Sequence, residues 1–188
     1  MASLPHYFIA IPLPEELQNY FSLWRNELHD KLPYKQWYHK QDLHITLKFL
    51  GAVNQEKIEA LYHALKKVEG ERAFELEVGS IGIFGNPKRP RVLWAGVENA
   101  NALLSIQKKI EDVCLEVSFS KENRPYRPHI TLAKKWTGNP KESYDNVLEQ
   151  IQRQFTQIER MHVHEIVVFQ IHPGRQQKYE PTKRYRLS

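Results

Sequence analysis

The tetrapeptide His-Ile-Thr-Leu occurs twice in this chain, at residues 44–47 and at residues 129–132. Around each copy, apolar and polar residues alternate, and this period of two is typical of a half-buried β-strand. The flanking segments repeat as well, because each half of the chain reads as strands separated by helical patterns. The repeat therefore predicts a duplicated fold in which two equivalent strands carry the same side chains.

Hydrophobic periodicity, prolines and glycines predict the elements of each half. In the first half we expect strands at 6–14, 43–51 and 74–85 and helices at 15–32 and 55–68. In the second half we expect strands at 91–98, 129–136 and 161–172, a terminal strand or hairpin arm at 178–188, and helices at 102–117 and 141–155. This order favours an α+β or α/β fold with its helices outside the sheets. The expected seam is the Pro- and Gly-rich segment 84–91.

Strict alternation predicts which side chains of the two motif strands face the core. The core-facing set is Leu43, Ile45, Leu47 and Phe49 in the first strand, and Ile130 and Leu132 in the second. The opposite face carries His44, Thr46 and Lys48 in the first strand, and His129, Thr131 and Ala133 in the second. Each strand is therefore expected to present one imidazole and one hydroxyl toward a cleft.

These four polar groups suit chemistry at a phosphodiester. An imidazole has an unperturbed pKa of about 6.5, so one of two facing histidines can donate a proton while the other accepts one. No Ser-His-Asp pattern activates Thr46 or Thr131, so their hydroxyls suit hydrogen bonding to an anionic oxygen better than nucleophilic attack. One strand histidine alone would be more typical of a structural role. The pair, in equivalent places, predicts an acid and a base for in-line displacement.

Metal binding is the competing use of histidine pairs. Neither motif carries a carboxylate at ligand spacing, and the sequence contains no His-Glu-x-x-His or Cys-x-x-Cys. His162 and His164 share one face of an expected strand, but an exposed pair of this kind is more often solvated than ligating. We therefore predict no metal and no cofactor.

Charge and cysteine content indicate which binding partners and which cellular compartment to expect for the protein. Lys and Arg outnumber Asp and Glu by 27 to 22, a formal net charge of +5, so the summed field attracts polyanions. The only cysteine, Cys114, lies in the apolar pattern of an expected helix and is predicted to be a core thiol. Pro12 and Pro14 interrupt the short apolar run near the start, which predicts neither a signal peptide nor a membrane span. We expect a cytoplasmic protein with no membrane and no obligate protein partner.

Five segments carry a resemblance to a known family. They are FIAIPLP (8–14), LHITLKFLG (43–51), FGNPKRPRVLWAGV (84–97), YRPHITLAKK (126–135) and HPGRQQKYEP (172–181). In their order and spacing these segments resemble the LigT-like RNA 2′,3′-cyclic phosphodiesterases, also called 2′-5′ RNA ligases, of the 2H phosphoesterase superfamily. The resemblance covers nearly the whole chain.

The resemblance implies a particular α+β fold. Two β-α-β-α-β halves would be related by a pseudo-twofold, with two antiparallel-rich sheets facing a central cleft and the helices outside. Residues 1–188 would form a single domain with lobes at about 1–85 and 90–188. An exchange of terminal strands between the lobes stays open.

The resemblance also implies an activity and roles for the motif residues. The activity is metal-independent hydrolysis of a 2′,3′-cyclic phosphate at an RNA end to a 2′-phosphate, with 2′-5′ RNA ligation as a side activity. By the resemblance, His129 would accept a proton from water and His44 would protonate the departing 3′-oxygen. Thr46 and Thr131 would hold the non-bridging oxygens.

Four further residues are candidates for substrate binding. Lys134 stands where family members often have arginine, and it keeps the charge but not the bidentate fork. Strict alternation points Lys134 away from the motif face unless the strand bends, whereas Lys48 is in phase with that face. Tyr126 and Arg127 could stack on a base or meet a phosphate.

Two alternatives remain at this point. A non-catalytic module would bind RNA or a nucleotide in the same cleft and turn nothing over. A different cyclic phosphodiesterase would act on a small nucleotide, such as a cyclic phosphate of an ADP-ribose derivative. This alternative stays open because the motif residues would contact the phosphate and do not specify the group attached to it.

Overall fold

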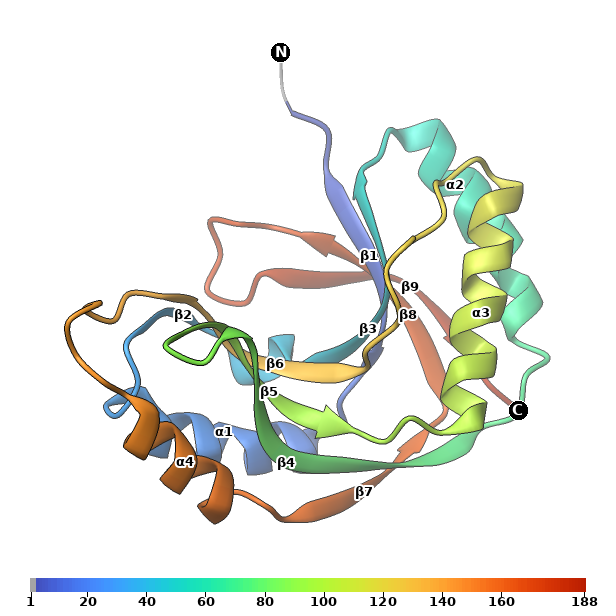
Figure 1. Ribbon diagram of the computed structural model, residues 1–188. Coiled ribbons are helices and arrows are strands. Elements are labelled where there is room, and N and C mark those ends of the chain that lie inside the picture. The colour runs from blue at the N-terminus through green and yellow to red at the C-terminus, as the bar shows by residue number, and fades with distance from the viewer. Residues whose placement is uncertain (1–2) are drawn as a thin grey trace.

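The computed structural model describes residues 3–188, which form nine β-strands, four α-helices and two short 3₁₀ helices (Figure 1). The strands are β1 (His6–Pro12), β2 (Tyr34–Trp37), β3 (His44–Ala52), β4 (Phe74–Asn86), β5 (Arg89–Val97), β6 (His129–Trp136), β7 (Ile158–Val163), β8 (Glu165–Ile171) and β9 (Tyr179–Arg186). The α-helices are α1 (Glu15–His29), α2 (Gln55–Ala64), α3 (Asn101–Glu116) and α4 (Asp145–Gln154), and the 3₁₀ helices are η1 (Lys40–Asp42) and η2 (Leu65–Val68).

The strands form one sheet made of two parts. Its order is β7-β4-β5-β6-β3-β1-β8-β9, with β2 added to β6, and the strand pairs among the described residues are antiparallel. The two parts meet where β3 and β6 pair only through Ile45 and Ile130. The antiparallel pairing confirms the α+β class, because an α/β fold needs parallel strands.

Strands from the two ends of the chain lie together in one part of the sheet. β1 and β3 pair with the C-terminal strands through β8 and β9, while the middle of the chain supplies β4, β5, β6 and β7 to the other part. The expected seam at 84–91 contains the tip of the hairpin between β4 and β5. The division of the chain into lobes at about 1–85 and 90–188 stays a prediction.

The helices lie outside the sheet. α3 packs against β3 and α4 against β4, and Figure 1 shows α2 and α3 on one side of the molecule and α1 and α4 on another. The helices bury the apolar stripes that the sequence predicts, including Leu17, Phe21, Trp24 and Leu28 of α1. Cys114 is fully buried in α3, and burial raises the pKa of its thiol to about 12, as suits a core thiol.

The sequence prediction was wrong for two segments. The expected strand 161–172 is two strands, and β7 pairs with β4 whereas β8 pairs with β1, far along the sheet. No Gly or Pro separates β7 from β8, so the pattern shows no boundary. The short strand β2 was missed because four residues are too few for a periodic pattern.

Each motif strand contains a register shift at the leucine of its motif. Along β3, Thr46 pairs with Ala10 but Lys48 pairs with Ile9, so Leu47 is an extra residue. Along β6, the same shift leaves Leu132 unpaired with β5. An extra residue of this kind is a β-bulge, and it moves the side chains that directly follow it to the other face of the sheet.

Among residues 3–188, no helix is both long enough and apolar enough to span a membrane.

Candidate active site

The two motifs meet at the centre of the sheet. Ile45 and Ile130 pair across β3 and β6, and both are fully buried. The residues on either side of each isoleucine therefore point to the opposite face. Continuing this antiparallel register by one residue in each direction places His44 toward Thr131 and Thr46 toward His129. The fold thus gathers the four predicted side chains on one face, each half-buried.

The two imidazoles are held in the same way. Nδ1 of His44 lies 2.7 Å from the carbonyl oxygen of Asp42, and Nδ1 of His129 lies 2.7 Å from that of Arg127. A carbonyl only accepts hydrogen bonds, so Nδ1 carries the proton in both rings and Nε2 is left for proton transfer. Nε2 of His44 lies 2.9 Å from the hydroxyl oxygen of Thr46.

Both imidazoles favour the neutral form. The pKa of His44 is lowered to about 4, mainly by burial and in addition by the charges of His129 and Lys134, while the hydrogen bond to Asp42 opposes the shift. Burial also lowers the pKa of His129, against the hydrogen bond to Arg127. A phosphate anion bound between the rings would raise the pKa of the histidines and so favour an imidazolium.

Aromatic rings enclose the two histidines. The ring centroid of Phe8 lies 4.7 Å from that of His44, and the ring of Tyr179 lies edge-on at 5.3 Å. The ring of Phe84 meets His129 edge-on at 4.8 Å. These contacts limit the rotamers of the imidazoles and account for part of their desolvation.

The two β-bulges correct the predicted orientation of four residues. Lys48 and Ala133 are buried, where alternation placed them on the motif face, and Phe49 is 60% exposed, where alternation placed it in the core. Lys134 lies with its Nζ 5.3 Å from the ring centroid of Tyr38 and close enough to lower the pKa of His44. Lys134, and not Lys48, is therefore the lysine beside the motif face.

Tyr126 and Arg127 each form a hydrogen bond to a motif residue. The hydroxyl of Tyr126 donates to the backbone oxygen of Thr46 at 3.0 Å, and burial raises the pKa of this phenol. The backbone oxygen of Arg127 accepts the hydrogen bond from His129, while its side chain is exposed. A contact of either side chain with substrate stays a prediction.

Residues 13–175 match the family model described as the 2′-5′ RNA ligase superfamily. The chain belongs to the 2′-5′ RNA ligase superfamily.

Two similar proteins share the name RNA 2′,3′-cyclic phosphodiesterase. The RNA 2′,3′-cyclic phosphodiesterase of Bacillus subtilis (strain 168) is 34% identical over 186 residues, which are 98% of this chain and 97% of the relative. A protein of the same name from Geobacillus stearothermophilus is 40% identical over 134 residues, but these span 71% of this chain and only 43% of the relative. Among solved structures, E. coli LigT complexed with 3′-AMP shares the fold, with a TM-score of 0.77, 24% identity and coverage of 98% of this chain and 99% of that chain.

Asp42 lies beside the motif face and is absent from the residues that the sequence predicts for the site. The carboxylate of Asp42 is buried and accepts hydrogen bonds from the backbone nitrogens of Lys178 at 2.8 Å and Tyr179 at 3.1 Å. Asp42 thereby fastens the start of β9 to η1, and its own carbonyl orients His44. Burial raises the pKa of Asp42, against those two hydrogen bonds. The one feature of the sequence that could have indicated this role is the position of Asp42, an acidic residue two positions before His44.

The second histidine pair lies elsewhere, on the segment from β7 to β8. The rings of His162 and His164 are 6.0 Å apart and nearly parallel, and Nδ1 of His162 lies 2.6 Å from a carboxylate oxygen of Glu75. Both histidines are exposed. Within residues 3–188, no group of three or more His, Cys, Asp or Glu side chains is arranged to hold a metal ion.

Proposed function

We propose that this protein hydrolyses the 2′,3′-cyclic phosphate at an RNA end to a 2′-phosphate, without a metal. The observation that carries the proposal is the pair of imidazoles with Nδ1 fixed by a carbonyl, sharing one face with two threonine hydroxyls. The relatives named RNA 2′,3′-cyclic phosphodiesterase support the substrate. The net charge of +5 suits a polyanion. We place the activity in the cytoplasm.

The proposed reaction is one in-line displacement at phosphorus. Nε2 of His129 takes a proton from water as the water oxygen bonds to phosphorus, and the bond from phosphorus to the 3′-oxygen breaks. Protonated His44 gives its Nε2 proton to that 3′-oxygen. Thr46 and Thr131 donate hydrogen bonds to the non-bridging oxygens, on which charge develops. His129 ends protonated and His44 neutral, and exchange with solvent restores both.

The test uses a short RNA with a 2′,3′-cyclic phosphate end, incubated with the protein in EDTA and followed by phosphorus NMR. We expect conversion to the 2′-phosphate alone, because one face of the phosphate meets the base and the other meets the acid. A 3′-phosphate product, or loss of activity in EDTA, would contradict the proposal. Binding without turnover would favour a binding module, and turnover of small cyclic nucleotides alone would favour a small-nucleotide enzyme.

Phe49 is the residue that we expect to favour RNA over a bare cyclic phosphate. The strand pairing puts Phe49 beside Phe8, which contacts His44, and its ring is 60% exposed. Stacking of a base on an aromatic ring is worth about 1–3 kcal/mol. Phe49→Ala should therefore raise KM for a short RNA by about 5- to 100-fold with little change in kcat. Phe49→Trp should keep a low KM, and Leu23→Ala, at an exposed site on α1, should change neither constant.

The pH dependence should differ between the free protein and its complex. The profile of kcat/KM reports the free protein, where the pKa of His44 is about 4 and that of His129 is below its usual 6.5. The reactive form needs a proton on His44 and none on His129, so kcat/KM should already fall with rising pH below 6.5. The bound phosphate anion raises the pKa of His44, so the alkaline limb of kcat should lie at higher pH. Coincident alkaline limbs for kcat and kcat/KM would contradict this expectation.

A further inference from the structure

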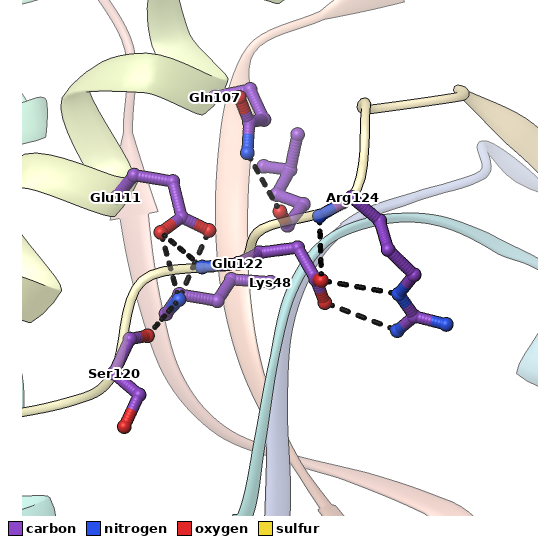
Figure 2. A network of polar contacts seen from close by, with 7 residues as sticks. Lys48, Gln107, Glu111, Ser120, Glu122 and Arg124 are labelled. Atoms are coloured by element: carbon purple, nitrogen blue, oxygen red, sulfur yellow. Dashed lines mark hydrogen bonds and ion pairs between the residues drawn. The ribbon is translucent and has the colours of Figure 1, made fainter.

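A buried ion pair lies beside the site but outside the proposed reaction. The side chains of Lys48 on β3 and Glu111 on α3 are only 4% and 11% exposed. As Figure 2 shows, the ammonium group reaches both oxygens of Glu111, at 3.0 and 2.8 Å, and the carbonyl oxygen of Ser120 at 2.9 Å. An ammonium has three protons, so each has an acceptor. The pair is buried because the bulge at Leu47 turns Lys48 away from the motif face.

The pair holds a segment that has no helix or strand of its own. Residues 118–128 connect α3 to β6, and Figure 1 shows this stretch crossing from the end of α3 to the start of β6. The Ser120 carbonyl accepts from the ammonium group, and the Glu122 N–H donates to Glu111 at 3.4 Å. Beyond that point the Glu122 carboxylate pairs with Arg124 at 3.1 Å (Figure 2).

The same segment ends in two groups that touch the motifs. The hydroxyl of Tyr126 bonds to the backbone oxygen of Thr46, and the backbone oxygen of Arg127 accepts the hydrogen bond from His129. The position of the segment therefore decides where the carbonyl that orients His129 lies.

We infer that Lys48 and Glu111 are positioning residues, which fix the 118–128 segment so that Arg127 can orient the imidazole of His129. The inference rests on the proposed function. It means that Lys48, on the strand of the first motif, helps to position His129 of the second motif. Neither residue contacts the substrate, since both are buried.

A purely structural role would not require hydrogen-bonding groups at these positions. Replacing a buried ion pair by apolar residues of similar volume is often neutral or stabilising. An apolar pair would fill the space between β3 and α3 but could bind neither the Ser120 carbonyl nor the Glu122 N–H. Side chains that can hydrogen-bond at both positions are needed to hold the segment as well.

The test compares two double variants with a matched control. Lys48→Met/Glu111→Leu keeps the packing and loses the bonds to the segment, whereas Lys48→Gln/Glu111→Gln keeps groups able to make those bonds without charge. The control, Lys108→Met/Asp112→Leu, removes an ion pair from the same helix whose side chains are 80% and 59% exposed. Thermal unfolding, kcat, KM and the NMR titration of His129 are measured on each.

We expect the Met/Leu variant to fold, with kcat reduced by about 10- to 100-fold and KM changed little, because the base is misplaced. Its His129 should titrate at lower pH, since the hydrogen bond to Arg127 that raises this pKa is weakened. The Gln/Gln variant and the control should resemble the wild type in both readouts. A folded Met/Leu variant with wild-type kcat and wild-type His129 titration would overturn the inference. Failure of that variant to fold would overturn it too, because the pair would then be a requirement of the fold.

The two proposals fail in different ways. If the wild type does not hydrolyse the cyclic phosphate, the proposed function fails. The titration of His129 needs no activity, so it still tests whether the pair positions this ring.

Discussion

Replacing either motif histidine by alanine should reduce kcat for cyclic phosphate hydrolysis by about 10²–10⁴-fold. Each change removes one of the two proton transfers of a single displacement, His44→Ala at the leaving 3′-oxygen and His129→Ala at the attacking water. The double variant should be little worse than either single variant, since the two groups act as a unit. Product formation is followed by phosphorus NMR, and KM is measured separately.

The matched control is His162→Ala, an exposed histidine on β7, which β4 and β5 separate from the motif strand β6. It should keep wild-type activity, and all of these variants should show similar thermal unfolding. A single motif variant with nearly full activity would rule out the paired mechanism.

A substrate with a good leaving group separates the two roles. From bis(p-nitrophenyl) phosphate, p-nitrophenolate departs without needing a proton, so His44→Ala should keep most of its activity there while His129→Ala should not. The low pKa of His44 in the free protein, about 4, makes this comparison informative. The proposed donor role requires the bound phosphate to raise that pKa. The reverse pattern of activities would exchange the two roles.

The second large effect is expected at the threonines. Thr46→Val or Thr131→Val should reduce kcat by about 10²–10³-fold, the usual effect of removing one hydrogen-bond donor to a developing oxyanion. Valine keeps the branched shape of threonine and the strand propensity, so only the hydroxyl is lost. The rate of single turnovers at saturating substrate measures this step directly.

Thr→Ser at the same positions keeps the hydroxyl and should recover most of the rate. If the valine variants raised KM and left kcat unchanged, the hydroxyls would bind substrate and transition state equally well, and their assignment to the transition state would be wrong.

Much of this site follows from short-range pattern. The period of two in each motif strand puts Ile45 and Ile130 in the core, and it therefore puts the histidine and threonine that flank each one on the other face. Identical motifs in two similar halves indicate that these faces meet. The chemistry of imidazole and hydroxyl groups then points to a phosphodiester.

The same pattern failed after the fourth residue of each motif. The sequence gives no sign of the bulges at Leu47 and Leu132, because a bulge depends on how the neighbouring strand pairs. The prediction therefore exchanged the environments of Lys48 and Phe49, and it pointed Lys134 away from the site.

By itself, then, the sequence determined most of the helices and strands and the four motif side chains, and its family resemblance implied the α+β class. Only the tertiary structure decided the rest: the break between β7 and β8, the carbonyls of Asp42 and Arg127 that orient the histidines, and the burial of Lys48 against Glu111. The reason is physical. Alternation and helical periodicity are properties of neighbouring residues, whereas register shifts, buried charges and carbonyl positions depend on contacts between segments far apart in the chain.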